Sequence, residues 1–179
     1  MESLETPEGR LSAGPVRLRR FQRGDLAAFQ AYRRDPEVGR YQSWSQMTDE
    51  AALRFIDAVA AGPAAPPGEW SQIAIAAAAD DGLVGDIGVF LAADESEAEI
   101  GFTIAPAAQG KGWGGAAAAR IIDYLFETTP ARRVIGIADK LNAPSLRLMT
   151  RIGMIAIAEE EAMFRGAPGV EVTYEMRRS

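Results

Sequence analysis

Gln109-Gly110-Lys111-Gly112-Trp113-Gly114-Gly115 is followed directly by four alanines and then by an apolar-periodic segment. Four glycines in seven residues leave main-chain N–H groups uncovered, so that an anion can approach them closely. A helix that begins here adds the positive end of its dipole to the same place. The stretch therefore predicts a site for phosphate groups at the entrance of a helix.

The segments around this stretch alternate between strand and helix patterns. Residues 97–104 alternate apolar and polar side chains and predict a strand that stops at Pro106. Residues 71–78 and 83–91 predict two strands joined by a hairpin, because Asp81-Gly82 accepts a positive φ. After the glycines we expect a helix to about residue 127, a strand at 133–138, a helix at 142–151, and strands at 155–158 and 170–176 around a turn at 166–169.

The N-terminal part continues this alternation. Residues 1–14 are polar and predict a flexible lead-in, so that a single domain spans residues 15–179. Residues 16–20 predict a strand, and Asp25 is the expected N-cap of a helix that ends before Pro36. Thr48 is the expected cap of a second helix. The order of elements predicts an α/β fold around a mixed sheet.

Composition excludes several classes of function. The chain has 179 residues, which suits one domain, and its net charge of −6 argues against a nucleic-acid partner and favours a cationic one. Cys and His are both absent, which excludes disulfides, Cys/His zinc sites, thiol nucleophiles and Ser/His hydrolases, and we expect no metal. The absence of a long apolar run and of a basic-then-apolar start predicts a cytoplasmic protein with no membrane partner.

Several interpretations compete for the glycine stretch. Gly110, Gly112 and Gly115 satisfy G-x-G-x-x-G, and Asp139 follows where a dinucleotide site needs an acid, but only about 40 residues remain after it. A nucleotide-binding P-loop is excluded because Lys111 is followed by Gly112 rather than by Ser or Thr. A loop that only allows tight packing rarely needs four glycines together. A further interpretation, a coenzyme A site, rests on a resemblance to a known family.

Gln109-x-x-Gly112-x-Gly114 resembles the Q/R-x-x-G-x-G/A signature of the GNAT superfamily of N-acyltransferases. Residues 99–106 resemble the strand that precedes its CoA loop, and residues 142–146 with 152–154 resemble its N-x-x-S and l-G-F/M segments. Residues 40–44 resemble the branch that acetylates ribosomal-protein N-termini, the RimJ/RimL type. Together the resemblance covers nearly all of residues 16–177.

The resemblance implies a fold and a set of ligand contacts. The fold is a mixed, mostly antiparallel sheet of about seven strands flanked by about four helices, and acetyl-CoA is the co-substrate. Its pyrophosphate would lie on the loop and on the start of the following helix, and its pantetheine would lie along the preceding strand. The residues implied in binding are Phe102, Thr103, Ile104, Gln109, Gly110, Lys111, Gly112, Trp113, Gly114, Gly115 and Asn142.

Transfer of an acetyl group from a thioester to an amine needs a base, oxyanion stabilisation and an acid for the leaving thiolate. Glu99 is the first candidate for the base, although Glu97 and Glu99 could instead form a solvated strand face. Asp86 is a second candidate, and water could relay the proton to a carboxylate. Many GNAT enzymes carry a Tyr acid at the position of Met149, which cannot donate a proton. Ser145, one turn earlier on the same helix, is then the implied acid, and Asn142 either holds pantetheine or caps the helix.

The acceptor is the part that the sequence defines least. Tyr41, Trp44 and Trp70 are candidates to hold an ammonium group by cation–π attraction, with core packing as the alternative. We expect an N-acetyltransferase that acts on a primary amine, either a protein N-terminus or a small molecule, by direct attack in a ternary complex. A non-catalytic acyl-CoA-binding regulator and a dinucleotide oxidoreductase remain as alternatives. The oligomeric state stays open, a homodimer included.

Overall fold

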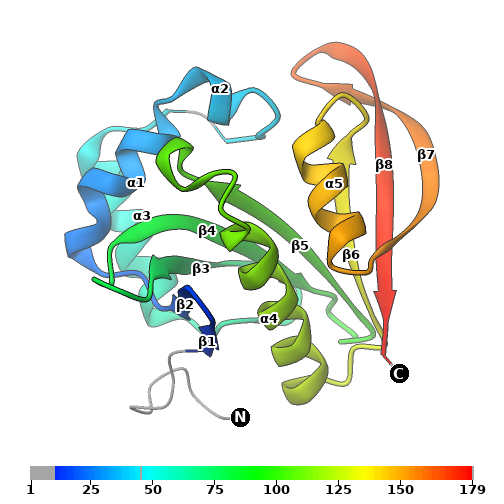
Figure 1. Ribbon diagram of the computed structural model, residues 1–179, viewed down its shortest axis with the longest axis horizontal. Helices are drawn as coiled ribbons and strands as arrows, with labels where there is room; N and C mark the ends of the chain where they lie inside the picture. Colours follow the sequence, from blue (N-terminus) through cyan, green and yellow to red (C-terminus); the bar gives the residue numbers. More distant parts are fainter. Residues whose placement is uncertain (1–10, 45, 179) are drawn as a thin grey trace.

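A computed structural model describes residues 11–44 and 46–178 of the chain. Its strands form one eight-stranded sheet in the order β1-β2-β3-β4-β5-β6-β8-β7 (Figure 1). Neighbouring strands pair antiparallel, except that β5 and β6 are parallel. The strands are β1 Leu11–Ala13, β2 Val16–Arg19, β3 Trp70–Ala77, β4 Leu83–Leu91, β5 Glu97–Ile104, β6 Arg133–Asp139, β7 Ile155–Phe164 and β8 Ala167–Arg177.

Five α-helices and two 3-10 turns accompany the sheet within these residues. They are α1 Leu26–Arg33, α2 Pro36–Gly39, α3 Asp49–Ala61, α4 Trp113–Thr128 and α5 Ala143–Arg151, with η1 Arg23–Asp25 and η2 Pro106–Ala108. The predicted class, a mixed and mostly antiparallel sheet flanked by helices, is confirmed. The sheet has one strand more than expected because β1 joins it, and the short helix α2 raises the number of helices to five.

Helices cover the two faces of the sheet in separate groups. Ile73 and Ile75 on β3 belong to the larger core cluster, together with Ile121 on α4. Ala74, which lies between them, belongs to the other cluster, with Phe29 on α1 and residues of α3. Because side chains of a strand alternate between faces, this division places α4 on one face and α1 with α3 on the other (Figure 1).

The strands β5 and β6 part in the middle of the sheet. Their pairing covers residues 97–99 of β5 against 133–135 of β6 and ends there. On its other side β5 stays paired with β4 as far as Ile104 and Gly85. The second half of β5 therefore has a partner strand on one edge alone, and its other edge is open for a ligand.

Main-chain hydrogen bonds show which groups of β5 face this open edge. Ala105 N–H donates to Val84 O at 2.8 Å, and Ala92 N–H donates to Glu97 O at 2.9 Å, so Glu97 and Ala105 bond toward β4. Hydrogen bonding alternates along an antiparallel strand, which directs the N–H and C=O groups of Phe102 and Ile104 away from β4.

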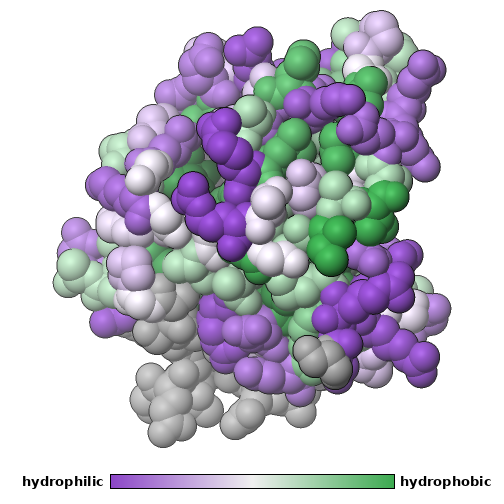
Figure 2. All heavy atoms as spheres, turned by 45° about the vertical axis from the view of Figure 1, so that its right-hand side comes forward, coloured by the Kyte–Doolittle hydropathy of each residue, from purple (hydrophilic) through white to green (hydrophobic). Residues whose placement is uncertain are grey.

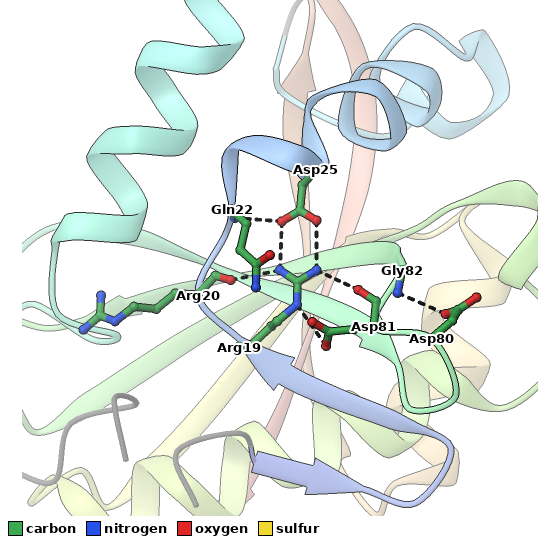
Figure 3. A network of polar contacts seen from close by, with 7 residues as sticks. All are labelled: Arg19, Arg20, Gln22, Asp25, Asp80, Asp81 and Gly82. Atoms are coloured by element: carbon green, nitrogen blue, oxygen red, sulfur yellow. Dashed lines mark hydrogen bonds and ion pairs between the residues drawn. The ribbon is translucent and has the colours of Figure 1, made fainter. Parts of the chain in front are cut away.

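Asp25 precedes α1 as predicted, but its side chain does not cap the helix. Its carboxylate is buried and accepts two hydrogen bonds of 2.8 Å from the guanidinium of Arg19, which also donates to Asp81 O at 2.9 Å (Figure 3). This ion pair joins β2, the start of α1 and the β3–β4 turn. Asp25 is used for a tertiary contact that its local sequence does not reveal.

Two boundaries also differ from the prediction. The turn between the last two strands lies at Arg165 and Gly166, both with positive φ, and Pro168 is within β8. Pairing of β8 with β6 ends at Glu171. Pro168 lies beyond this pairing, so the strand tolerates a residue that has no N–H to donate toward β6. Residues 11–13 pair with β2 instead of belonging to the lead-in, and residues 1–10 lie outside the described residues.

The side of the molecule that carries α5, β7 and β8 exposes several large apolar side chains. Ile155, Ile157 and Met163 are 69%, 45% and 69% exposed. Figure 2 brings this side forward and shows hydrophobic atoms among hydrophilic ones. No helix in the described part of the chain is both long and apolar enough to span a membrane.

Candidate active site

The glycine loop has the geometry of an anion site. Gly110 and Gly112 have φ values of 75° and 76°, and a Cβ at either would meet no atom within 4 Å, so conformation and not space requires glycine there. The first hydrogen bond of α4 runs from Ala116 N–H to Gly112 O at 3.1 Å. The N–H groups of residues 113–115 precede this bond and remain available to an anion.

Gly114 serves a different purpose in the same loop. A Cβ there would lie 3.0 Å from Leu148 Cδ1 and 3.1 Å from Ile104 Cγ1. The glycine lets the start of α4 pack against the end of β5 and against α5. The sequence offered tight packing as an alternative explanation for all four glycines, and it applies to Gly114. Gly115 is less restricted, because its Cβ would be 3.6 Å from Ile152.

The other side chains of the loop contact the loop itself. Lys111 Nζ lies 4.8 Å from the centre of the Trp113 ring, a cation–π geometry, and Trp113 packs against the core beside the loop. Gln109 Nε2 donates to Ile104 O at 3.0 Å, across the η2 turn. The first residue of the signature thus fixes the loop to the end of β5.

The open edge of β5 holds the strand residues that the sequence assigned to pantetheine. Ile104 O accepts from Gln109, and Phe102 O accepts from Gln42 Nε2 at 3.5 Å. The N–H groups of Phe102 and Ile104 point to the same side. Thr103 is buried and bonds toward β4, so its main chain does not reach this edge. An extended ligand with amide groups fits such an edge, and the glycine loop follows it directly.

Glu99 and Glu97 differ in their surroundings. Glu97 forms an ion pair with Arg133, whereas no hydrogen bond or ion pair reaches the carboxylate of Glu99 from residues 11–44 or 46–178. Burial raises the pKa of Glu99, and the negative charges of Glu97 and Glu171 raise it further. Glu99 is therefore a half-buried carboxylate with an elevated pKa, and Glu97 is the one with a charge partner.

Trp70 shares the sheet face of Glu99. Trp70 is opposite Phe90 and Phe90 is opposite Glu99, so the three residues form a row across β3, β4 and β5. The rings of Trp70 and Phe90 are 5.6 Å apart, and Trp70 is 52% exposed. Trp70 is thus an exposed aromatic surface near the candidate base.

Tyr41 and Trp44, the other predicted acceptor residues, already have partners. The Tyr41 hydroxyl donates to Leu141 O at 3.2 Å, in the β6–α5 loop. The ring of Trp44 lies 4.4 Å from the guanidinium carbon of Arg33. Both residues come from the segment between α2 and α3.

Asp86, the weaker candidate for the base, is enclosed. It is 2% exposed, accepts from the Tyr32 hydroxyl at 2.5 Å, and lies 3.4 Å from Arg33 Nη2. Burial raises the pKa of Asp86, although Arg33 and Tyr32 act in the opposite direction. With its oxygens occupied and no exposed surface, Asp86 stabilises the packing of α1 on β4 and is not accessible to an acceptor.

The start of α5 holds the predicted acid. Asn142 Oδ1 accepts from Ser145 N–H at 3.3 Å, which confirms the capping role of Asn142. Met149 is buried over Gly136 of β6, whose Cβ would lie 2.7 Å from the Met149 sulfur. Ser145, one turn earlier, is half-buried. Leu148 on the same helix and Ile104 of β5 both pack around Gly114, which places the middle of α5 beside the end of β5.

Two residues at this site were missed by the sequence interpretation. Gln42 contacts the open edge of β5, and Arg165 Nη2 donates to Gln42 O at 2.8 Å and to Trp44 O at 3.1 Å. Nothing in the local sequence around Arg165 marks it. The resemblance of residues 40–44 to a known branch was the one signal for Gln42.

Known proteins share this arrangement. Residues 16–155 match the family described as the acetyltransferase (GNAT) domain. The chain is 29% identical over 137 residues to the uncharacterized N-acetyltransferase YnaD of Bacillus subtilis (strain 168), a stretch that covers 76% of this chain and 77% of that protein. A GNAT-family acetyltransferase from Bacillus anthracis has a TM-score of 0.82 at 24% identity, with 93% and 96% of the two chains covered.

A second solved structure extends the likeness in fold. The spermidine N-acetyltransferase of Vibrio cholerae, solved with CoA and spermine, has a TM-score of 0.76 at 18% identity, with 91% and 95% of the chains covered. The family match spans most of this chain and includes the strand, the glycine loop and the helix described above. The chain therefore belongs to the GNAT family of acetyltransferases, and it is an acetyltransferase enzyme.

Proposed function

We propose that the protein transfers an acetyl group from acetyl-CoA to a primary amine by direct attack in a ternary complex. The observation that carries this proposal is the set of chemical groups that β5 presents along its length. Its first half presents Glu99, a carboxylate with a raised pKa. Its second half presents the main-chain N–H groups of Phe102 and Ile104 on an edge that has no partner strand. The anion-binding loop follows the same strand.

The donor would be held by main-chain groups. The N–H groups at the start of α4 suit the pyrophosphate, and Lys111, which is part of the loop, adds a positive charge beside them. The pantetheine amides suit the open edge of β5 at Phe102 and Ile104. An N–H of this edge would face the thioester oxygen and stabilise negative charge there without reorganisation.

Two side chains would move the protons. Glu99 would accept a proton from the ammonium group of the acceptor, directly or through water, because a carboxylate with a raised pKa is a stronger base. Ser145 would donate a proton to the leaving thiolate, since Met149 has no proton to give and is buried. Leu148, about one turn after Ser145 on α5, packs with Ile104 of β5 around Gly114, which supports this assignment.

The acceptor is proposed to be a cationic amine. Glu99 and Glu171 lie on one face of the sheet, and Trp70 offers an exposed ring on the same face. Tyr41 and Trp44 border this region from the α2–α3 segment. The V. cholerae relative in fold binds spermine, a polyamine. A protein N-terminus remains a second acceptor class, in line with the resemblance of residues 40–44 to the RimJ/RimL type.

The test is an acceptor screen that measures release of the free CoA thiol. The panel contains polyamines, monoamines, amino-acid amides and short peptides with free N-termini, each compared with the same compound acetylated. We expect turnover with one class of free amine and a large loss of rate in Glu99→Gln. Tight binding of acetyl-CoA without turnover of any amine would contradict the proposal and favour a non-catalytic acyl-CoA-binding role.

A further inference from the structure

The segment between α2 and α3 crosses the region where β5 and β6 part. We call residues 40–44 the strap. Tyr41 donates to Leu141 O at 3.2 Å, beside the cap of α5, and Gln42 donates to Phe102 O at 3.5 Å on β5. Trp44 stacks on Arg33 of α1 at 4.4 Å. The strap is therefore attached to both sides of the divergence and to the helix layer beneath it.

One side chain from the far end of the chain holds the strap from outside. Arg165, at the turn of the β7–β8 hairpin, has a φ of 50° and donates to both Gln42 O and Trp44 O, 123 and 121 residues away. Figure 1 shows the tip of this hairpin and the α2 segment at the same end of the molecule. A positive φ in a residue other than glycine is uncommon, and here it occurs at the tight turn that places Arg165 at the tip of the hairpin.

Gln42 links this latch to the strand that would bind the donor. Its main-chain oxygen accepts from Arg165, and its side-chain amide donates to Phe102 O. Fixing the backbone of Gln42 limits where its amide can lie, so the hairpin tip acts on the open edge of β5 through one residue. The contact of Gln42 is long for a hydrogen bond, which makes it sensitive to a small shift of the strap.

We propose that Arg165 is a positioning residue for the acetyl transfer. It latches the strap across the divergence of β5 and β6, holds Gln42 against the carbonyl of Phe102, and so shapes the border of the acceptor site. This inference rests on the proposed function. Arg165 contacts neither reactant in it. Its effect passes through residues 40–44. Because Gln42 touches the carbonyl of Phe102 and leaves the β5 N–H groups proposed for pantetheine in place, loss of Arg165 should act on the acceptor more than on CoA.

Kinetics of Arg165→Ala, Gln42→Ala and the double variant test the proposal. We expect Arg165→Ala to lower kcat/KM for the amine by about tenfold, the loss typical of charge-assisted hydrogen bonds, with the Kd of acetyl-CoA unchanged. The double variant should be no worse than the more impaired single variant, because the two residues act in one chain of contacts. Additive losses, or an equal loss of CoA affinity, would overturn the proposal.

Two further variants separate positioning from general stability. Arg54→Ala removes an exposed ion pair with Glu50 on α3, away from the strap, and should leave kcat/KM unchanged. Arg165→Lys keeps one charged donor and should recover part of the loss. A loss as large in Arg54→Ala, or no recovery in Arg165→Lys, would overturn the assignment of a specific latch.

Amide hydrogen exchange supplies a readout that does not depend on turnover. Exchange of residues 40–44 should be faster in Arg165→Ala than in the wild type, with exchange of α4 unchanged. Equal exchange of the strap in the two proteins would overturn the latch even if the acetyl transfer is demonstrated. Faster exchange of the strap in a protein that acetylates no amine would support the latch and contradict the proposed function.

Discussion

Glu99 on β5 and Glu171 on β8 face the same side of the sheet and interact electrostatically, although β6 lies between their strands. Burial is the largest cause of the raised pKa of Glu99, and the charges of Glu97 and Glu171 add to it. The carboxylate therefore holds its proton to a higher pH than an exposed glutamate. If Glu99 is the base, as proposed, the pH dependence of the reaction depends on the order of the strands, because β8 brings Glu171 to this face.

Glu171→Gln should move the acid limb of the pH–rate profile to lower pH. The rate rises with pH as the base ionises, and removal of a like charge lowers the pKa of Glu99, so ionisation occurs earlier. At the pH where the wild type is half-maximal, the variant should be faster by up to about twofold, with the same plateau. Profiles of kcat/KM measure the shift. Glu127→Gln, on the exposed end of α4, is the control, and an unmoved limb in Glu171→Gln would contradict Glu99 as the titrating base.

Glu99→Gln should lose activity and gain stability at neutral pH. Because the pKa of Glu99 is raised in the folded state, the folded chain binds this proton more tightly than the unfolded chain does. Below the unfolded pKa, wild type and variant should melt alike. As pH rises through the folded pKa, the wild type should lose stability relative to Glu99→Gln. Calorimetric Tm values from about pH 4 to about pH 8 test this, and a parallel pair of curves would contradict it.

Local patterns in the sequence were sufficient for much of the fold. The alternation in residues 97–104 and the Asp81-Gly82 turn each depend on a few neighbouring residues, so the sequence alone predicts them. The strands β4 and β5 have the predicted bounds. The glycine loop and the Asn142 cap were also predictable, because their geometry depends on residues a few positions apart. The roles of these residues in binding CoA remain predictions.

Contacts between distant segments were beyond the sequence. The sequence around Asp25 fits two roles equally well, the N-cap of α1 and the ion-pair partner of Arg19, because both roles need a carboxylate at this position. Likewise, Arg165 reaches Gln42 only because β8 lies between β6 and β7, an order that strand patterns do not specify. Glu99 and Glu97 look equivalent along the strand, and their difference arises from Arg133 on β6.

Gly112→Ala should weaken CoA binding. The residue has a φ of 76° at the start of α4, and alanine there costs about 1–2 kcal/mol or moves the loop. Because an affinity change of tenfold corresponds to about 1.4 kcal/mol, we expect the Kd of CoA to rise about tenfold. Gly14→Ala is the matched control: its φ is 65°, its Cβ would also meet no atom within 4 Å, and it lies in the β1–β2 turn. It should lose stability and keep its CoA affinity, and equal Kd values for all three proteins would contradict the loop assignment.

Asp25→Ala should destabilise the protein strongly. The change leaves the buried guanidinium of Arg19 without its bidentate partner, and loss of one member of a buried pair costs about 3–5 kcal/mol. Asp57→Ala is the matched control, because Asp57 pairs with Arg23 at 2.9 Å in an exposed position, and its loss should have little effect. Urea unfolding measures both variants. Similar midpoints for the two would show that the Arg19–Asp25 pair has no special weight in joining β2 to α1.

Ser145→Ala should separate catalysis from donor binding. Asn142 caps α5 through the main-chain N–H of residue 145, so the substitution removes the hydroxyl and leaves the cap. If Ser145 protonates the leaving thiolate, kcat should fall by about 10²–10⁴-fold, the usual contribution of general acid catalysis, with the Kd of CoA unchanged. Ser145→Thr keeps a hydroxyl and should retain more activity than the alanine variant. Rapid-quench measurement of the acetyl-transfer step makes the comparison independent of product release. If the rate of this step is unchanged in Ser145→Ala, Ser145 has no part in the mechanism and water is the acid.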